Sequence, residues 1–157
     1  SLRVGEYSWA ENFIQEYSIY LPVSIRENAR TFNLANLYSH QKQHAKVIEL
    51  LRDVEYSDVV YSLGAKLILI RTYFDSGEWL ALDSLIDSFR IFLRRNKVIS
   101  KTLKREYNNF LNFVKRLTTL HMADDKTIAA FRRRVMAASA NTPKKWLLEK
   151  IAEIEGA

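Results

Sequence analysis

The chain has 157 residues, with 24 Lys and Arg side chains against 18 Asp and Glu and no Cys, so it has the length of one ordinary domain and a net charge of +6. The lack of Cys excludes disulfides and thiolate metal sites and fits a reducing compartment, which favours the cytoplasm. Only 4 Gly and 2 Pro are present, which excludes Gly-rich phosphate loops, disfavours a fold of many β-hairpins and predicts an all-α protein.

Apolar residues recur at three- and four-residue spacing along nearly the whole chain, as they do in one-sided helices. The spacing predicts about eight helices, at residues 7–20, 25–41, 44–55, 58–75, 79–95, 98–121, 125–139 and 143–155. Asp124 is the expected N-cap of the seventh helix, and Thr142 followed by Pro143 is the expected start of the eighth. Every apolar run is far shorter than the roughly 20 residues of a membrane span, so no span is expected.

The strongest internal signal is a recurrence of apolar positions after 35 residues. Leu34, Ala35, Tyr38, His44, Val47, Leu51 and Val54 are followed at that offset by Leu69, Ile70, Tyr73, Trp79, Leu82, Ile86 and Phe89. An earlier half unit repeats the turn, since Gly5 and Tyr7 match Gly77 and Trp79. The repeating unit is therefore expected to be a pair of antiparallel helices, and a non-repetitive helical bundle is the alternative.

This pattern resembles the tetratricopeptide repeat (TPR) family, whose hairpins carry Leu, a small residue and Tyr on helix A, then a turn Gly, an aromatic and a small residue on helix B. The resemblance implies a single domain over residues 1–157, built as an α-solenoid of stacked hairpins. Its parts are a half repeat at 5–22, repeats at 28–60 and 63–96, an irregular helix pair at 98–139 and a capping helix at 143–155. Lys42 stands where the family has its turn Gly, and His44 stands where it has the aromatic residue. A chain that starts with Ser1 and a half repeat is expected to be the C-terminal part of a longer protein.

Signals for catalysis are weak, and we expect no enzymatic activity, no cofactor and no metal site. His40 and His44 have the four-residue spacing of a zinc pair, but they flank a predicted turn and no carboxylate accompanies them. His121 and the pair Asp124 and Asp125 are explained by the charge preferences of helix ends.

The TPR resemblance implies a partner groove on the inner faces of the A helices. The matching side chains are Phe32, Asn36, Ser39 and His40 in one repeat and Leu67, Arg71 and Phe74 in the next. The lysines that complete a carboxylate clamp in some members are missing, so no such clamp is expected. A mixed apolar and polar groove still suits a protein or peptide partner. Ordinary helix packing is the alternative role for Phe32, Leu67 and Phe74.

The net positive charge comes from the C-terminal part of the chain. Residues 1–90 carry 9 basic and 12 acidic side chains, whereas residues 91–150 carry 15 basic and 4 acidic ones. The candidate basic patch comprises Arg94, Arg95, Lys97, Lys101, Lys104, Arg105, Lys115, Arg132, Arg133 and Arg134. Such a patch fits nucleic acid or an acidic protein surface, and its alternative role is that of a solvated face. Helical spacing places Arg133 and Arg134 in solvent and Arg132 at the margin of the buried stripe.

The leading hypothesis is therefore a non-enzymatic scaffold of TPR-like type that binds another protein. The alternative is binding of nucleic acid or an acidic partner through residues 94–134. A third hypothesis, an accessory domain of a larger enzyme or secretion assembly, fits a chain that is part of a longer protein.

Overall fold

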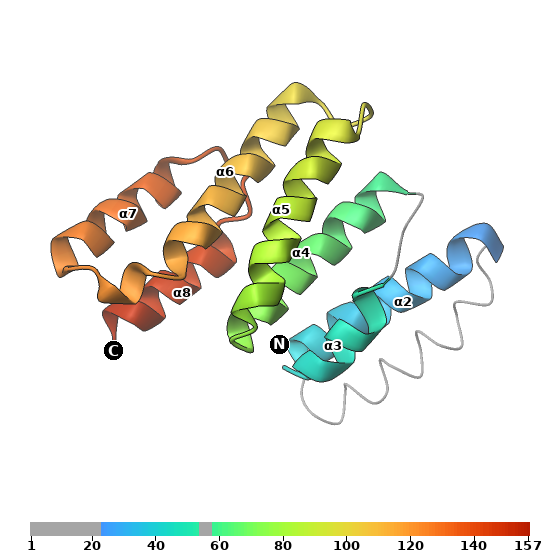
Figure 1. Ribbon diagram of the computed structural model, residues 1–157, viewed down its shortest axis with the longest axis horizontal. Coiled ribbons are helices and arrows are strands. Elements are labelled where there is room, and N and C mark those ends of the chain that lie inside the picture. The colour runs from blue at the N-terminus through green and yellow to red at the C-terminus, as the bar shows by residue number, and fades with distance from the viewer. Residues whose placement is uncertain (1–22, 54–57) are drawn as a thin grey trace. The chain divides into compact units, whose positions relative to one another are not determined.

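The computed structural model describes residues 23–53 and 58–157 (Figure 1). All regular structure in these residues is helical, which confirms the predicted all-α class for them. The elements are α2 (Val23–His40), α3 (His44–Leu51), α4 (Val59–Asp75), α5 (Trp79–Arg95), α6 (Lys101–Leu117), the 3-10 turn η2 (Leu120–Met122), α7 (Asp125–Ala137) and α8 (Lys145–Glu155). The half repeat expected at 5–22 and the last residues of the helix expected at 44–55 lie outside the described ranges. In the described part of the chain, none of the helices is both long and apolar enough to cross a membrane.

The helix expected at 98–121 is shorter than predicted at both ends. It begins at Lys101, because the Ser100 hydroxyl caps it by accepting a hydrogen bond of 3.1 Å from a backbone N–H of the first turn. It ends at Leu117, and the hydroxyl of Thr118 then donates to a carbonyl of the last turn at 2.7 Å. Hydroxyl side chains that bond to the backbone in this way compete with helix continuation, and η2 follows instead.

Of the two helix starts predicted from capping residues, one is confirmed and one is wrong. Asp124 caps α7, since its Oδ1 accepts a hydrogen bond of 2.8 Å from Thr127 N, and the hydrogen bonds from Thr127 lower the pKa of this carboxyl. Thr142 does not cap α8, which begins at Lys145. Its backbone N–H donates to Ser139 O at 2.9 Å in a separate turn, and its side chain is buried.

The chain forms two compact units, and the division between them falls inside α5, between Leu85 and Ile86. In the first unit, α2, α3 and α4 each pack against the other two, with α3 lying against α2 (Figure 1). Its buried apolar side chains include Leu34, Ala35, Leu37, Val47, Leu51, Leu63, Ile68, Leu69, Ile70 and Tyr73. These are the faces that the three- and four-residue spacing placed inside.

The turns after α2 and α4 have the same backbone structure, 35 residues apart. Lys42 has φ 56° and Gly77 has φ 71°, so both adopt the left-handed conformation that commonly ends a helix. In each turn, the N–H of this residue donates to the carbonyl three residues before it, at 3.1 Å and 3.2 Å respectively. The next N–H donates to the carbonyl five residues back, at 2.9 Å in both turns. Each turn is therefore a Schellman motif, and the 35-residue offset seen in the sequence is present in the backbone of these turns.

The second unit contains the end of α5, α6, η2, α7 and α8, and α8 packs against both α6 and α7. Its buried apolar side chains include Phe89, Phe110, Leu111, Val114, Leu117, Leu120, Ile128, Phe131, Val135, Leu147 and Ile151. Two polar contacts reinforce the packing. Ser139 Oγ donates to the buried carboxylate of Glu106 at 2.7 Å, and Arg132 Nε donates to Glu155 Oε1 at 2.6 Å.

Candidate binding surfaces

Phe32, the first predicted groove residue, lies in the contact between α2 and α4. Its ring meets the ring of Tyr61 edge-on, with centroids 5.4 Å apart. It also lies over Gly64, so closely that a Cβ placed on Gly64 would be 2.5 Å from Phe32 Cε2. The packing role that the sequence left open for Phe32 is therefore the one observed, and Gly64 is the residue that permits it.

The predicted groove residue Phe74 packs beside the turn between α4 and α5. Its ring meets Trp79 edge-on at a centroid distance of 5.3 Å. Trp79 is nevertheless 49% exposed, although the 35-residue pattern placed it at an aromatic packing position, and the neighbouring Leu80 is 86% exposed. These three residues leave apolar surface accessible at the start of α5 in the first unit.

The remaining groove candidates, Asn36, Ser39 and His40 on α2 and Leu67 and Arg71 on α4, are half-buried, except for His40, which is exposed. The ring of His40 is 2.8 Å from the carbonyl oxygen of Asn36, measured from Nδ1. Arg71 Nε donates to Leu67 O at 3.4 Å. Both side chains thus hydrogen-bond to the backbone of their own helix, and α2 and α4, which carry the five residues, contact each other.

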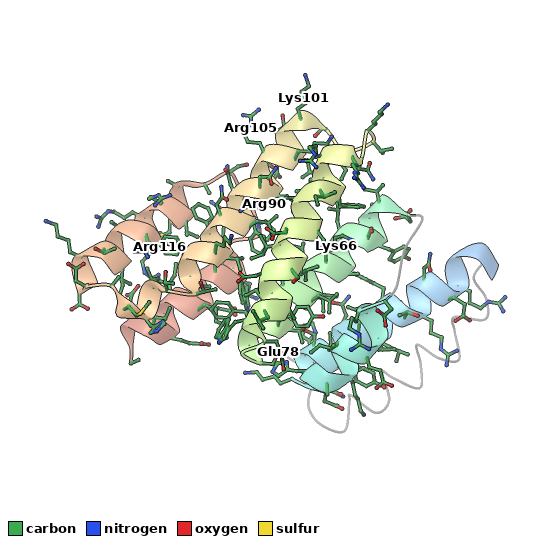
Figure 2. The ribbon with its side chains drawn as sticks, in the orientation of Figure 1. Lys66, Glu78, Arg90, Lys101, Arg105 and Arg116 are labelled. Carbon is green, nitrogen blue, oxygen red and sulfur yellow. The ribbon has the colours of Figure 1, made fainter. Side chains whose placement is uncertain are left out.

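The predicted basic patch falls into three stretches, of which the densest is a hairpin tip. We define the basic tip as Arg94, Arg95, Lys97, Lys101, Lys104 and Arg105, which stand at the end of α5, in the following loop and at the start of α6. Figure 2 shows Lys101 and Arg105 at the start of α6 and Arg116 toward its other end. Lys115, next to Arg116, is about 21 Å from Lys101 along the helix axis, at 1.5 Å per residue. The ten residues therefore do not form one continuous cluster.

The basic tip is unneutralised within the described part of the chain. Residues 94–105 include no Asp or Glu. None of the six basic side chains makes an ion pair or hydrogen bond with a residue that the structure describes, and all except the half-buried Lys104 are exposed. The helix dipole favours Arg94 and Arg95 at the end of α5, but it disfavours Lys101 and Lys104 in the first turn of α6. Helix stability therefore does not explain the charges on α6.

The arginine triplet on α7 contains one residue with an ion-pair partner and two with no partner in the part of the chain that the structure describes. Arg132 is half-buried and pairs with Glu155 of α8, as its place at the margin of the buried stripe suggested. Arg133 and Arg134 are exposed, as predicted, and neither has an ion-pair or hydrogen-bond partner among the described residues. The Arg132 pair joins residues 23 positions apart, and only the packing of α7 on α8 brings them together.

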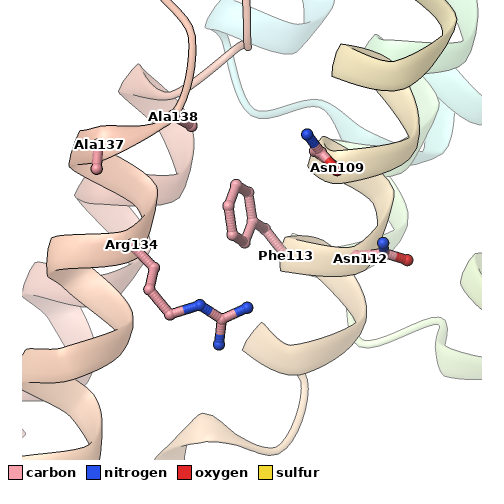
Figure 3. A pocket seen from close by; sticks show the side chains of 6 residues that line it. All are labelled: Asn109, Asn112, Phe113, Arg134, Ala137 and Ala138. Carbon is pink, nitrogen blue, oxygen red and sulfur yellow. The ribbon is translucent and has the colours of Figure 1, made fainter.

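A pocket between α6 and α7 was not predicted from the sequence. Its volume is about 360 Å³, and its lining residues are Asn109, Asn112, Phe113, Arg134, Ala137 and Ala138 (Figure 3). The lining residues are spaced i, i+3 and i+4 on α6, and the same spacing runs from Arg134 of α7 to Ala138, which follows the last residue of that helix. Residues at this spacing share one face of a helix. The sequence does not reveal that these two faces are opposite each other.

None of the family models, curated proteins or solved structures compared with this chain matches it. Within the described residues, no group of three or more His, Asp or Glu side chains is arranged to hold a metal ion. The function of the chain is therefore inferred from its groove residues, its basic residues and the pocket between α6 and α7.

Proposed function

We propose that this chain is a non-enzymatic protein–protein interaction scaffold of TPR-like type. The observation that carries the proposal is the recurrence of one turn structure at Lys42 and Gly77, at the same 35-residue offset as the apolar pattern. Repeated helix hairpins stack into extended surfaces on which side chains of successive units line up, and such surfaces serve to bind other proteins.

The packing of the first unit supports the same proposal. The helix A candidates of the two repeats, α2 and α4, contact each other, and α3 contacts both. This is the order of contacts expected when a hairpin stacks on the first helix of the next one. Stacked in this way, Asn36, Ser39 and His40 of α2 and Leu67 and Arg71 of α4 form the proposed partner surface, without Phe32, which packs between the helices.

A capture experiment with the full chain tests this function. The immobilised chain is exposed to a lysate, and retained proteins are compared between the wild type, Asn36→Ala/His40→Ala and the matched control Asn33→Ala/Lys46→Ala, whose residues are exposed on α2 and α3. A retained protein that is lost with Asn36→Ala/His40→Ala and kept with the control supports the scaffold and its surface. The proposal is overturned if wild-type chain retains no protein above an unrelated helical control.

A second candidate function is binding of a polyanion, nucleic acid in particular, through the basic tip. The specific observation in its favour is that six basic side chains have no carboxylate partner in the described structure. Duplex DNA binding would weaken with salt by a log–log slope of about −0.9 for each phosphate contacted. Elution of the wild type and of Arg95→Gln/Lys101→Gln from heparin, with Lys126→Gln/Lys145→Gln as a charge-matched control, tests it. Flow-through of the wild type at low salt removes this candidate.

A further inference from the structure

The pocket between α6 and α7 has walls that other contacts hold in place. On one wall, the Phe113 ring meets Phe131 edge-on, with centroids 5.8 Å apart, which joins α6 to α7. Ser139, just beyond the end of α7, donates to the buried Glu106 of α6 at 2.7 Å. Since α8 also packs against both helices, the pocket does not depend on a ligand to keep its two sides together. Figure 3 shows the Arg134 side chain extending from α7 toward α6 below the Phe113 ring.

The polar groups around this pocket are mostly hydrogen-bond donors. Arg90 Nη2 donates to Asn112 Oδ1 at 2.7 Å, and Figure 3 shows the Asn112 amide directed away from Arg134, so this amide is engaged outside the pocket. Arg134 carries a guanidinium with five N–H donors and has no partner among the described residues. The exposed amide of Asn109 is likewise unbonded within that part of the structure. A ligand rich in acceptors, such as one with carboxylates and carbonyls, matches this set.

The charge around the pocket selects for an anion. Residues 101–138 carry nine basic and three acidic side chains. Of the three, Glu106 is buried and accepts a hydrogen bond from Ser139, and Asp124 and Asp125 stand at the start of α7, whereas Arg134 lies in its last turn. The pocket itself contains Arg134 and no carboxylate. Electrostatic complementarity therefore favours an acidic partner.

The apolar part of the lining indicates that the pocket suits a peptide better than a bare phosphate ion. The Phe113 ring and the methyl groups of Ala137 and Ala138 make up half of the lining residues. Phosphate contacts need cations and donors but make no use of an aromatic face. A volume of about 360 Å³ is at the lower end of the range of ligand pockets, about 300–1,000 Å³, so it suits a short segment.

We propose that this pocket binds an extended, acidic peptide segment of a partner protein. Arg134 takes a side-chain carboxylate of the segment, Asn109 hydrogen-bonds to its backbone, and an adjacent apolar side chain of the segment lies on Phe113. Because it names a partner class for the scaffold, this inference rests on the proposed function.

The test is fluorescence anisotropy with the full chain and a hexapeptide that carries fluorescein on its N-terminus, fluorescein-Glu-Leu-Glu-Glu-Leu-Glu-amide. A second peptide, with Gln in place of every Glu, is expected to bind at least about tenfold more weakly, as loss of a charge-assisted bond predicts. Arg134→Gln is expected to weaken binding of the acidic peptide by about tenfold. Arg133→Gln is the matched control, because Arg133 carries the same charge at the neighbouring position of α7, is also exposed and lies outside the pocket lining. A change of about twofold or less is expected for this variant.

A filling variant gives an independent readout. Ala137 is exposed, so Ala137→Phe is expected to fold normally, to occupy the pocket and to abolish peptide binding. Ala152→Phe, at an exposed position of α8, is the size-matched control and is expected to bind as the wild type does. Thermal unfolding of each variant shows whether it has folded.

Equal weakening by Arg133→Gln and Arg134→Gln would overturn the proposal in favour of diffuse charge attraction. Absence of peptide binding, with duplex DNA bound in an Arg134-dependent way, would assign the surface to nucleic acid and also overturn it. The two proposals fail separately. If the peptide does not bind but the capture experiment retains a protein through Asn36 and His40, the pocket inference falls and the scaffold stands.

Discussion

Lys42 and Gly77 occupy the same position in two turns 35 residues apart, one with a side chain and one without. Both residues have a left-handed backbone, and the hydrogen bonds around them are the same. A Cβ in this conformation costs roughly 1–2 kcal/mol, because it approaches the following carbonyl oxygen. The turn after α2 therefore forms despite a strain that the turn after α4 avoids, and the surrounding helices must supply the difference.

Replacing Lys42 with Gly is expected to stabilise the chain by about 0.5–1 kcal/mol, since relief of strain exceeds the added freedom of the unfolded chain. Gly77→Lys is expected to destabilise it by about 1 kcal/mol. Urea denaturation followed by circular dichroism measures both. Lys42→Ala is the control, because it removes the long side chain and keeps the Cβ, and it should give no gain. A loss of stability in Lys42→Gly would show that the backbone of Lys42 is not strained.

The close approach of Phe32 to Gly64 predicts that Gly64→Ala has opposite effects on stability in the wild type and in a Phe32→Leu background. In the wild type, Gly64→Ala is expected to destabilise the chain, because overpacking costs about 1–3 kcal/mol and the gain in helix propensity is about 1 kcal/mol. In a Phe32→Leu background, which removes the ring atoms that the new Cβ meets, the same substitution is expected to be neutral or stabilising. Denaturation of the four proteins gives the double-mutant cycle. Additive effects would show that the ring does not restrict this position.

The ion pair between Arg132 and Glu155 predicts that the arginine triplet is not uniform in its effect on stability. Both side chains are partly exposed, so loss of the pair in Arg132→Gln is expected to cost at most about 1 kcal/mol. Arg133→Gln is expected to change stability by no more than about 0.5 kcal/mol, because this side chain has no partner among the described residues. Thermal melting at low and high salt compares them. If Arg132→Gln remains as destabilising in a Glu155→Gln background, the pair contributes nothing.

Two tyrosines, the buried Tyr73 and the half-buried Tyr107, predict that the stability of the fold decreases at alkaline pH. Burial raises the pKa of the Tyr73 phenol, with Arg52 opposing and Asp53 and Glu78 adding to the shift, and burial followed by Glu106 raises the pKa of Tyr107. A phenol whose pKa is higher in the folded state than in the unfolded state stabilises the fold. This stabilisation is complete at pH values below the ordinary pKa of 10.0, and it is lost as the pH rises through the pKa of the folded state.

Absorbance of phenolate against pH, in native and denatured protein, measures this effect. Of the 8 tyrosines, Tyr73 and Tyr107 should ionise at higher pH in the native chain than in the denatured one. Tyr107→Phe should remove one of the delayed ionisations. Identical native and denatured titrations would contradict the raised pKa values.

The sequence by itself determined the helical class, most helix positions and the 35-residue recurrence. It also placed the Asp124 cap and the exposure of Arg133 and Arg134. These features depend on contacts within one or two helical turns, where apolar spacing and capping side chains act on neighbouring backbone, so they can be deduced from local order.

Only the tertiary structure decided which side chains meet across helices. It placed Phe32 over Gly64, paired Arg132 with Glu155 and brought Phe113 and Arg134 together in one pocket. Each of these contacts depends on the register and crossing of two helices, and a shift of one residue would exchange the facing positions. Helical spacing gives the face of each side chain, but the partner of that face is set by how neighbouring helices pack.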